Sequence, residues 1–190
     1  MRYFLYPKTT GNLIFQTFHL KNFRDFLRSD CFNFDNIFEF GGGYGSMAKN
    51  FIKSNKKSKY YIFDLFELSL LQFYYLKKNN FDVGILDNLK KKNNQISLIF
   101  SYEDFNKIIL NLPQNKKNLF IANWSISEIP LNFRDNVVKT TSSIDYKFIT
   151  FSNVFENIDN MKFFENLKKS EINQNRECVI KKIDMYKDNY

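Results

Sequence analysis

The stretch Ile37-Phe38-Glu39-Phe40-Gly41-Gly42-Gly43-Tyr44-Gly45 holds four of the chain's six glycines within five positions. The residues before the glycines are mostly apolar, which favours a short buried strand. Residues 46–53 then place apolar side chains on one face of a helix. Glycine allows a tight turn and lets the backbone approach a ligand without an intervening Cβ, while a helix N-terminus offers unpaired N–H groups. The stretch therefore predicts a nucleotide-type binding turn between a strand and a helix.

Short apolar runs and helical patterns alternate over the rest of the chain. Further strands are expected at residues 59–64, 96–100, 119–123, 146–151 and 177–183, and helices at residues 21–28, 67–78, 103–110, 133–140 and 160–168. Strands that alternate with helices imply right-handed crossovers between parallel strands. The expected fold class is therefore α/β, a Rossmann-like doubly wound, mainly parallel sheet with helices on both faces.

Two acidic residues indicate the kind of nucleotide. Asp64 ends the second expected strand, 19 residues after Gly45, where a carboxylate can accept from both ribose hydroxyls; the alternative is that it only caps the next helix. The glycines read G-x-G-x-G rather than the dinucleotide pattern G-x-G-x-x-G, and Glu39 precedes them by two positions. An acid there would repel a pyrophosphate but can pair with the ammonium group of S-adenosylmethionine. The alternative for Glu39 is an acid held by backbone donors.

Composition excludes several classes of protein. The chain is 44% hydrophobic and 18% aromatic, so it can bury a core and is not expected to be disordered, and no apolar run reaches the roughly 20 residues of a bilayer span. Cys31 and Cys178 match no metal or redox spacing, which favours a reducing cytoplasm. The net charge of +8 comes from 23 Lys and only 5 Arg, beside 25 Asn, as A/T-rich codons would produce. Because Arg is the better phosphate ligand, no nucleic-acid partner is expected.

At these residues the chain resembles class I S-adenosylmethionine-dependent methyltransferases. It is more narrowly similar to the sugar O-methyltransferase family, through residues 38–45, 60–65, 72–76 (Gln72-Phe73-Tyr74-Tyr75-Leu76) and 123–129. Phe66 departs from that family's pattern, which has proline at this position. The resemblance implies a sheet of strand order 3-2-1-4-5-7-6, and the six strands counted here leave room for an incomplete final strand pair. It also implies an N-terminal helical segment, residues 1–34, that partly caps the substrate, and a cofactor-binding domain, residues 35–190.

The resemblance also implies which residues hold S-adenosylmethionine. Ser101 and Tyr102 would lie beside the adenine, and the end of the fourth strand, from Asn123 to Ser125, would line the site of methyl transfer. The full expected set is Glu39, Gly41, Gly42, Gly43, Tyr44, Gly45, Asp64, Leu65, Ser101, Tyr102, Asn123, Trp124 and Ser125.

Transfer to a hydroxyl requires alignment and a proton acceptor or a metal. His19 is the only histidine, although a packing role is the alternative, and Glu128 lies just past the transfer strand, where it could instead be a first-turn helix carboxylate. No His, Asp or Glu cluster has metal-ligand spacing, so no metal is expected. The segment from Asn123 to Ile126 lacks the two prolines that amine methyltransferases of nucleic acids carry here.

The expected function is that of a cytoplasmic S-adenosylmethionine-dependent O-methyltransferase that acts on a hydroxyl of a sugar or glycan precursor. Two alternatives stay open: a shortened methyltransferase-like domain that binds the cofactor or a partner without catalysis, and an NAD-dependent oxidoreductase that uses the same turn. A further alternative, a nucleic-acid methyltransferase, is supported mainly by the net charge of +8. The sequence does not predict the oligomeric state.

Overall fold

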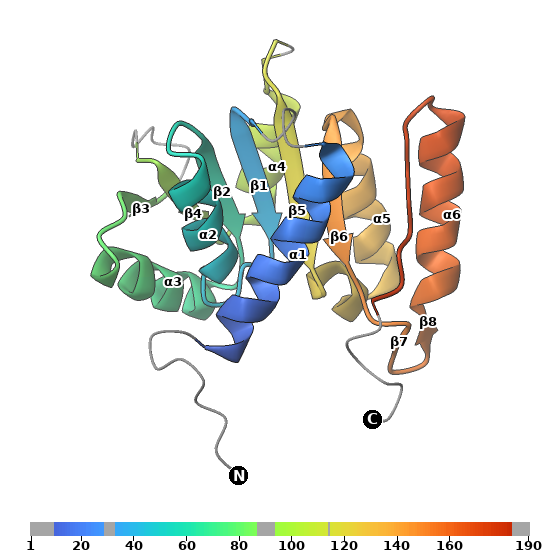
Figure 1. Cartoon of the computed structure of the whole chain (residues 1–190), viewed down its shortest axis with the longest axis horizontal. Helices are drawn as coiled ribbons and strands as arrows, with labels where there is room; N and C mark the ends of the chain where they lie inside the picture. Colours follow the sequence, from blue (N-terminus) through green and yellow to red (C-terminus); the bar gives the residue numbers. More distant parts are fainter. Residues whose placement is uncertain (1–9, 29–32, 87–93, 114, 184–190) are drawn as a thin grey trace. The chain divides into compact units, whose positions relative to one another are not determined.

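The computed structural model describes residues 10–28, 33–86, 94–113 and 115–183, so Cys31 lies outside the described residues. The chain divides into two compact units, Met1–Thr150 and Phe151–Tyr190, which are described separately. In the first unit, six strands form one sheet in which every neighbouring pair is parallel (Figure 1). The strand order is β3-β4-β2-β1-β5-β6. The strands are β1 (Asn36–Phe40), β2 (Lys59–Phe63), β3 (Val83–Ile85), β4 (Ile96–Ile99), β5 (Asn118–Asn123) and β6 (Tyr146–Thr150).

This order confirms the expected fold class, a Rossmann-like doubly wound α/β sheet. The series β4-β2-β1-β5-β6 corresponds to positions 3-2-1-4-5 of the expected order, and β3 adds a parallel strand at the edge beside β4. Strands for positions 6 and 7 are not found in this sheet among the described residues. The short Val-Gly-Ile sequence of β3 was not predicted, because three residues with a central glycine carry little strand signal.

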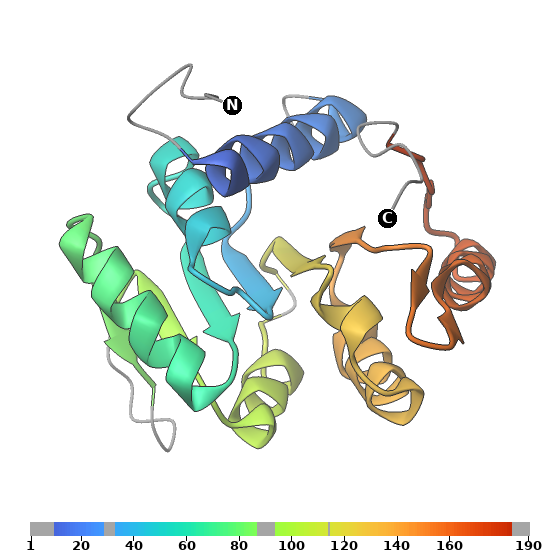
Figure 2. The ribbon, with the colours of Figure 1, turned by 90° about the horizontal axis from the view of Figure 1, so that it is seen from below.

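Helices cover both faces of the sheet (Figure 2). The first unit contains α1 (Gly11–Leu27), α2 (Ser46–Ser54), α3 (Phe66–Lys78), α4 (Tyr102–Leu110) and α5 (Leu131–Thr140), with short 3-10 helices η2 (Ser125–Glu128) and η3 (Thr141–Ser143). The first helix is longer than predicted, because the Thr10 hydroxyl caps its start by accepting from the Leu13 N–H at 3.2 Å. It packs on α2, where Asn50 donates to Thr17. The predicted domain division at residue 34 stays a prediction.

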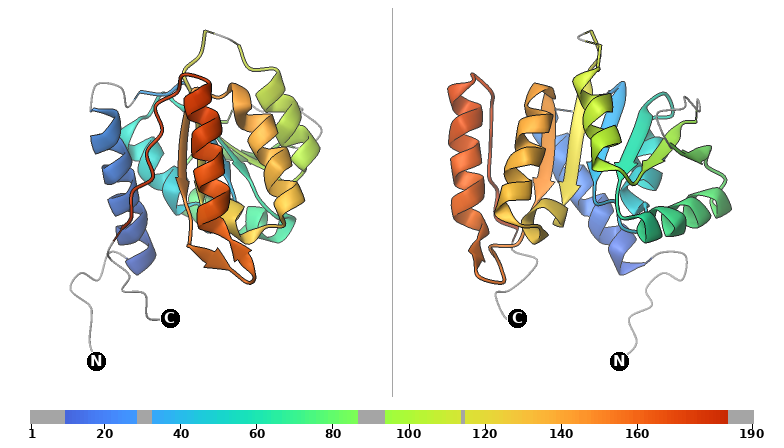
Figure 3. Two further views of the ribbon diagram at one scale, coloured as in Figure 1. Left: turned by 90° about the vertical axis from the view of Figure 1, so that its right-hand side faces the viewer. Right: turned by 180° about the vertical axis from the view of Figure 1, so that it is seen from behind.

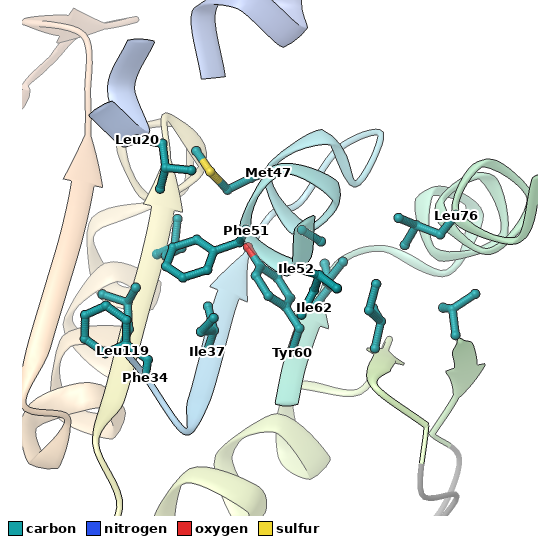
Figure 4. Close-up of a cluster of buried hydrophobic side chains, with 14 of the residues drawn as sticks. Leu20, Phe34, Ile37, Met47, Phe51, Ile52, Tyr60, Ile62, Leu76 and Leu119 are labelled. Carbon is teal, nitrogen blue, oxygen red and sulfur yellow. The ribbon is translucent and has the colours of Figure 1, made fainter. Parts of the chain in front are cut away.

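The core on one face joins α1, α2 and α3 to the central strands. Figure 4 shows Leu20 of α1, Phe51 of α2 and Leu76 of α3 directed toward strand residues such as Ile37 and Ile62. Burying each such side chain contributes about 1.5–3 kcal/mol relative to leaving it exposed. Since these strands are covered on both faces, they are apolar almost throughout, as the sequence pattern predicted.

The opposite face is covered by α4 and α5, which lie toward the viewer in the right-hand view of Figure 3. Its core is aromatic: Phe105 of α4 packs against Phe38, Phe40 and Phe63, with ring centroids 5.3–6.4 Å apart. Phe133 of α5 meets Phe40 at 6.0 Å. Phe38 and Phe40, which alternate with Ile37 and Glu39 along β1, therefore hold the second layer of helices.

The second unit contains a hairpin of β7 (Val154–Phe155) and β8 (Ile158–Asp159), followed by α6 (Asn160–Asn173). The strand expected at residues 177–183 is wrong, because this segment is not a strand. Its apolar and β-branched residues favour a strand. That preference takes effect only where a neighbouring strand is present to pair with, and this segment is paired with none among the described residues. Among the described residues of both units, no helix is long and apolar enough to cross a membrane.

Candidate functional site

The topology places a ligand site at one edge of the sheet. From β1 the chain passes to β2 and β4 on one side, and then returns to β5 and β6 on the other side of β1. In doubly wound sheets, ligands bind beyond the carboxyl ends of the strands at this point of reversal. The glycine turn leaves the carboxyl end of β1, and Asn123 ends the neighbouring β5, so both predicted segments lie at this edge.

The glycine turn needs its glycines for different reasons. Gly41, Gly43 and Gly45 have φ values of +72°, +53° and +76°, a backbone region that other residues rarely adopt. A Cβ on Gly41 would also collide with the side chain of Ser125, which follows β5. A Cβ on Gly43 would meet nothing within 4 Å, so this glycine borders open space. The turn therefore packs closely against the segment after β5 at Gly41, and it borders open space at Gly43.

Asp64 ties the glycine turn to the end of β2. Its Oδ2 accepts from the Gly43 N–H at 2.9 Å and from Gln72 Nε2 at 2.8 Å, and its Oδ1 accepts from the Leu65 N–H at 2.9 Å. Burial raises the pKa of Asp64, and the donors Leu65, Gly43 and Gln72 oppose that shift. Leu65 is the N-cap residue of α3, so this bond lies at the start of the helix, as the capping alternative given above expects. The role of Asp64 toward a ribose stays a prediction, and it is compatible with these bonds because a carboxylate has about four lone-pair positions.

Glu39 lies directly beneath the turn. It is only 2% exposed, and a Cβ on Gly42 would stand 3.3 Å from its Oε2. The buried Tyr60 hydroxyl donates to the same Oε2 at 2.9 Å. Burial raises the pKa of Glu39 to about 8, the Tyr60 bond opposes the shift, and the nearby Asp64 charge adds to it. Among the described residues, the Glu39 carboxyl accepts from the Tyr60 hydroxyl and from no backbone N–H, in contrast to the alternative given in the sequence analysis.

Large apolar side chains lie exposed next to these acids. Tyr44 is 58% exposed, Leu65 68% and Phe66 50%, and the Phe66 ring meets Phe100 edge-on at 5.3 Å. Phe66 stands where the sugar O-methyltransferase pattern has proline, and it is the first residue of α3.

The two residues expected beside an adenine have structural contacts of their own. Ser101 caps α4 by accepting from the Asp104 N–H at 3.3 Å. The Tyr102 hydroxyl lies 3.0 Å from Thr140 Oγ1, and its ring packs on Phe133 at 4.9 Å. Tyr102 thus connects α4 to α5, and a role for its ring against an adenine stays a prediction.

The end of β5 is held by long-range contacts. Asn123 Nδ2 donates to Gln16 of α1 at 3.1 Å, and its Oδ1 accepts from Thr150 of β6 at 3.1 Å. Trp124 has a φ of +60°, and its ring stacks on Phe15 of α1 at 4.8 Å. The Ser125 hydroxyl donates to the Phe40 carbonyl, at the start of the glycine turn. The predicted transfer segment is therefore connected both to α1 and to the predicted cofactor segment.

The two proposed proton acceptors differ in environment. His19 is 3% exposed among the rings of Phe15, Phe18 and Trp124, and its Nε2 has no hydrogen-bond partner within the part of the chain that is described. Burial lowers the pKa of His19 to about 4, so its imidazole is neutral at pH 7. Glu128 is exposed at the end of η2. A catalytic role for either residue stays a prediction.

Several residues of this region were not predicted from the sequence to have a role at the site. Tyr60 and Gln72 stand within the quoted motifs, but nothing in a single sequence indicates that their polar atoms meet Glu39 and Asp64. Arg134 of α5 is fully buried and donates to the carbonyls of Ser127 at 2.5 Å and Ile129 at 2.7 Å, which fixes the segment after β5. Within the described ranges, no group of three or more His, Cys, Asp or Glu residues is placed to hold a metal ion.

The chain matches no known family's sequence profile, and no curated protein is significantly similar to it in sequence. Among solved structures, it is similar to PKMT2 from Rickettsia typhi in complex with AdoHcy, with 15% identity and a TM-score of 0.41 over 60% of this chain and 19% of that chain. It is also similar to PigF with SAH (14% identity, TM-score 0.43, 65% of this chain, 31% of that chain). A third similar structure is the mitomycin 7-O-methyltransferase MmcR, with 11% identity and a TM-score of 0.41 over 70% of this chain and 36% of that chain.

The chain thus spans between 19% and 36% of the length of these three proteins. At TM-scores below 0.5 the likeness carries no argument about activity. The strand order of the sheet establishes the fold class by itself.

Proposed function

We propose that this chain binds S-adenosylmethionine at the glycine turn and transfers its methyl group to a hydroxyl of a sugar or glycan precursor. The observation that carries the proposal is the buried Glu39 beneath the turn, close enough to Asp64 for the Asp64 charge to raise the pKa of Glu39. A ligand bound over this turn meets two carboxyl groups. Such a site favours a cationic ligand.

This electrostatic environment separates the proposed cofactor from a dinucleotide. A pyrophosphate placed at the turn would raise the pKa of both acids further, and it would be repelled by either acid in its ionised form. An α-ammonium group would instead lower the pKa of Glu39 and form a charge-assisted hydrogen bond with it. NAD is therefore the weaker candidate on physical grounds.

The carboxylate, ribose and adenine of the proposed cofactor would also find matching groups at this site. The N-terminus of α2 carries no side-chain cap, so its N–H groups are available to a carboxylate. Asp64 Oδ1 retains capacity for a ribose hydroxyl beside its bond to Leu65. The exposed Leu65 and Phe66 offer apolar surface for an adenine. When bound, the cofactor supplies an electrophilic methyl group on a sulfonium, for which the end of β5 provides the transfer site.

The acceptor would meet Asn123, Trp124 and the residues of α1 that contact them. A neutral His19 imidazole can take a proton at Nε2, and Glu128 can do so as a carboxylate; we propose these two as the candidate bases. The sugar class itself rests on the resemblance of residues 38–45, 60–65, 72–76 and 123–129 to the sugar O-methyltransferase family.

Calorimetry with S-adenosylmethionine and S-adenosylhomocysteine tests the cofactor. We expect binding by the intact chain, and at least about tenfold weaker binding in Asp64→Ala, which loses a charge-assisted contact, and in Gly43→Val, which fills the open space. Asp25→Ala and Gly11→Val are matched controls, since Asp25 is exposed and a Cβ on Gly11 meets nothing. Absence of binding, or protection against unfolding by NAD(H) alone, would contradict the proposal.

One observation favours the alternative of a binding domain without catalysis. Both ends of the Asn123 amide are bonded within the protein, and Trp124 and His19 are packed against Phe15. Incubation with labelled cofactor and a pool of sugars and sugar nucleotides distinguishes the two. Cofactor binding with no methyl transfer to any of them would favour the alternative.

A further inference from the structure

The glycine turn is fastened to α3 by one buried amide side chain. Gln72 is fully buried on α3, and its Nε2 donates both to the Gly43 carbonyl at 3.0 Å and to Asp64 Oδ2 at 2.8 Å. The Gly43 N–H donates to the same Oδ2. Gln72, Gly43 and Asp64 therefore form a closed set of three hydrogen bonds, which we call the turn clasp.

The two acceptors, the Gly43 carbonyl and the Asp64 carboxylate, determine the orientation of the Gln72 amide. A carbonyl and a carboxylate can only accept, so Nε2 has to face both of them. As a result, Oε1 points away and has no hydrogen-bond partner among the described residues. An unpaired buried carbonyl destabilises a protein, whereas an apolar side chain of similar size at this place would leave no such group. The donation by Nε2 is thus the contribution that an apolar residue could not make.

We propose that Gln72 is a positioning residue that holds Asp64 and Gly43 in the arrangement that receives the ribose and methionine parts of the ligand. The inference rests on the proposed function. Gln72 touches no ligand in this scheme; it acts through the Asp64 carboxylate and the Gly43 backbone. Without it, Gly43 itself keeps, among the described residues, the bond from its own N–H to Asp64, beside the contact of the Gly42 N–H with the same carboxylate.

The charge of the residue at position 72 gives the proposal a specific signature. In Gln72→Glu the shape is nearly kept, but a carboxyl group replaces the donor and faces Asp64, with Glu39 as the next acid and the Tyr60 hydroxyl already bonded to Glu39. When the introduced carboxyl is ionised, it repels Asp64 and cannot donate to Gly43. When it is protonated at lower pH, its O–H can donate to Asp64 again.

The experiment measures S-adenosylhomocysteine affinity by calorimetry between pH 5 and pH 8 for the wild type, Gln72→Glu, Gln72→Met and the exposed control Gln174→Glu. We expect about tenfold or more weaker binding in both position-72 variants near pH 8, and no change in the control. The ratio of the Gln72→Glu dissociation constant to that of the wild type should fall toward 1 as the pH falls. The corresponding ratio for Gln72→Met should stay constant.

A second readout needs no ligand. Hydrogen exchange of the Gly43 amide, followed by NMR, should be faster in Gln72→Met than in the wild type, because the acceptor Asp64 is no longer held. Unchanged affinity and exchange in Gln72→Met, or equal weakening of both variants at every pH, overturns the inference. If Gln72→Glu does not fold, the exchange and affinity of Gln72→Met decide. If the wild type binds no S-adenosylhomocysteine, the proposed function fails, while Gly43 exchange still tests the clasp.

Discussion

The two halves of the site at the carboxyl edge of the sheet are built in different ways. In the half around β1, β2 and α3, hydrogen bonds join residues that are 8 to 29 positions apart, all between Glu39 and Gln72. In the half around β5, Asn123 is bonded to Gln16, 107 positions away, and to Thr150 of β6. The first half is a local structure with two acidic side chains, Glu39 and Asp64, at its centre, and the second is a long-range assembly of amides and aromatic rings.

Each half also contains a buried group whose pKa burial shifts strongly, and the two shifts have opposite directions. Glu39 is an acid whose pKa is raised to about 8, and His19 is a base whose pKa is lowered to about 4. Both groups are therefore held in their neutral form near pH 7 by the same cause, burial. The difference between them lies in the proposed function: a bound cationic ligand would reverse the shift of Glu39, whereas packing on Phe15 and Trp124 maintains that of His19.

Gly41→Ala should have the largest effect, because Gly41 is where the two halves touch. The introduced Cβ meets Ser125, and the φ of +72° is unfavourable for alanine, so we expect a loss of about 3 kcal/mol in the free energy of unfolding. Urea unfolding measures it, with Gly11→Ala as the control that meets no atom. A loss below about 0.5 kcal/mol would show that the halves adjust independently.

Glu39→Gln should weaken cofactor binding and stabilise the free protein. The unfolded carboxyl has a pKa near 4.5 and the folded one about 8, so the wild type loses stability as the pH rises between these values, because its unfolded state ionises first. Glutamine does not titrate, and its amide oxygen can still accept from Tyr60. We expect the unfolding temperature of the variant to exceed that of the wild type increasingly from pH 5 to pH 8.

The same variant should bind S-adenosylmethionine about tenfold more weakly at pH 8, where a charged partner for the ammonium is missing. Wild-type affinity should rise with pH up to about 8, because Glu39 must ionise to form the pair. A variant with lower stability and unchanged affinity would assign Glu39 to the fold alone.

His19→Phe should have the smallest effect at neutral pH, since it replaces a neutral ring among Phe15, Phe18 and Trp124 by an apolar one and removes an unpaired Nε2. The wild type should lose stability as the pH falls from 6.5 to about 4, because its unfolded state binds the proton first, and the variant should not. Thermal unfolding at pH 7, 5.5 and 4.5 measures the difference. Equal acid sensitivity in both proteins would place the responsible groups elsewhere.

The sequence predicted the local half well and the long-range half poorly. The glycine turn, Asp64 and five of the six strands of the sheet follow from periodicity and spacing within a few tens of residues. The bonds of Gln72 and Tyr60 could not be derived, because side-chain direction depends on the register between β1, β2 and α3. Gln16 and Arg134 gave no signal at all, since their partners are backbone or amide groups reached only through the tertiary fold.

The bond between Gln16 and Asn123 has a consequence for how the protein is made. Residues 36–76 leave the ribosome as a consecutive segment and contain every partner of the turn clasp, so this half can form early. Helix α1 is synthesised before them, yet its polar partner at the site appears more than a hundred residues later. We therefore expect α1, although it comes first in the sheet-bearing unit, to complete its docking only after β5 and β6 have joined the sheet.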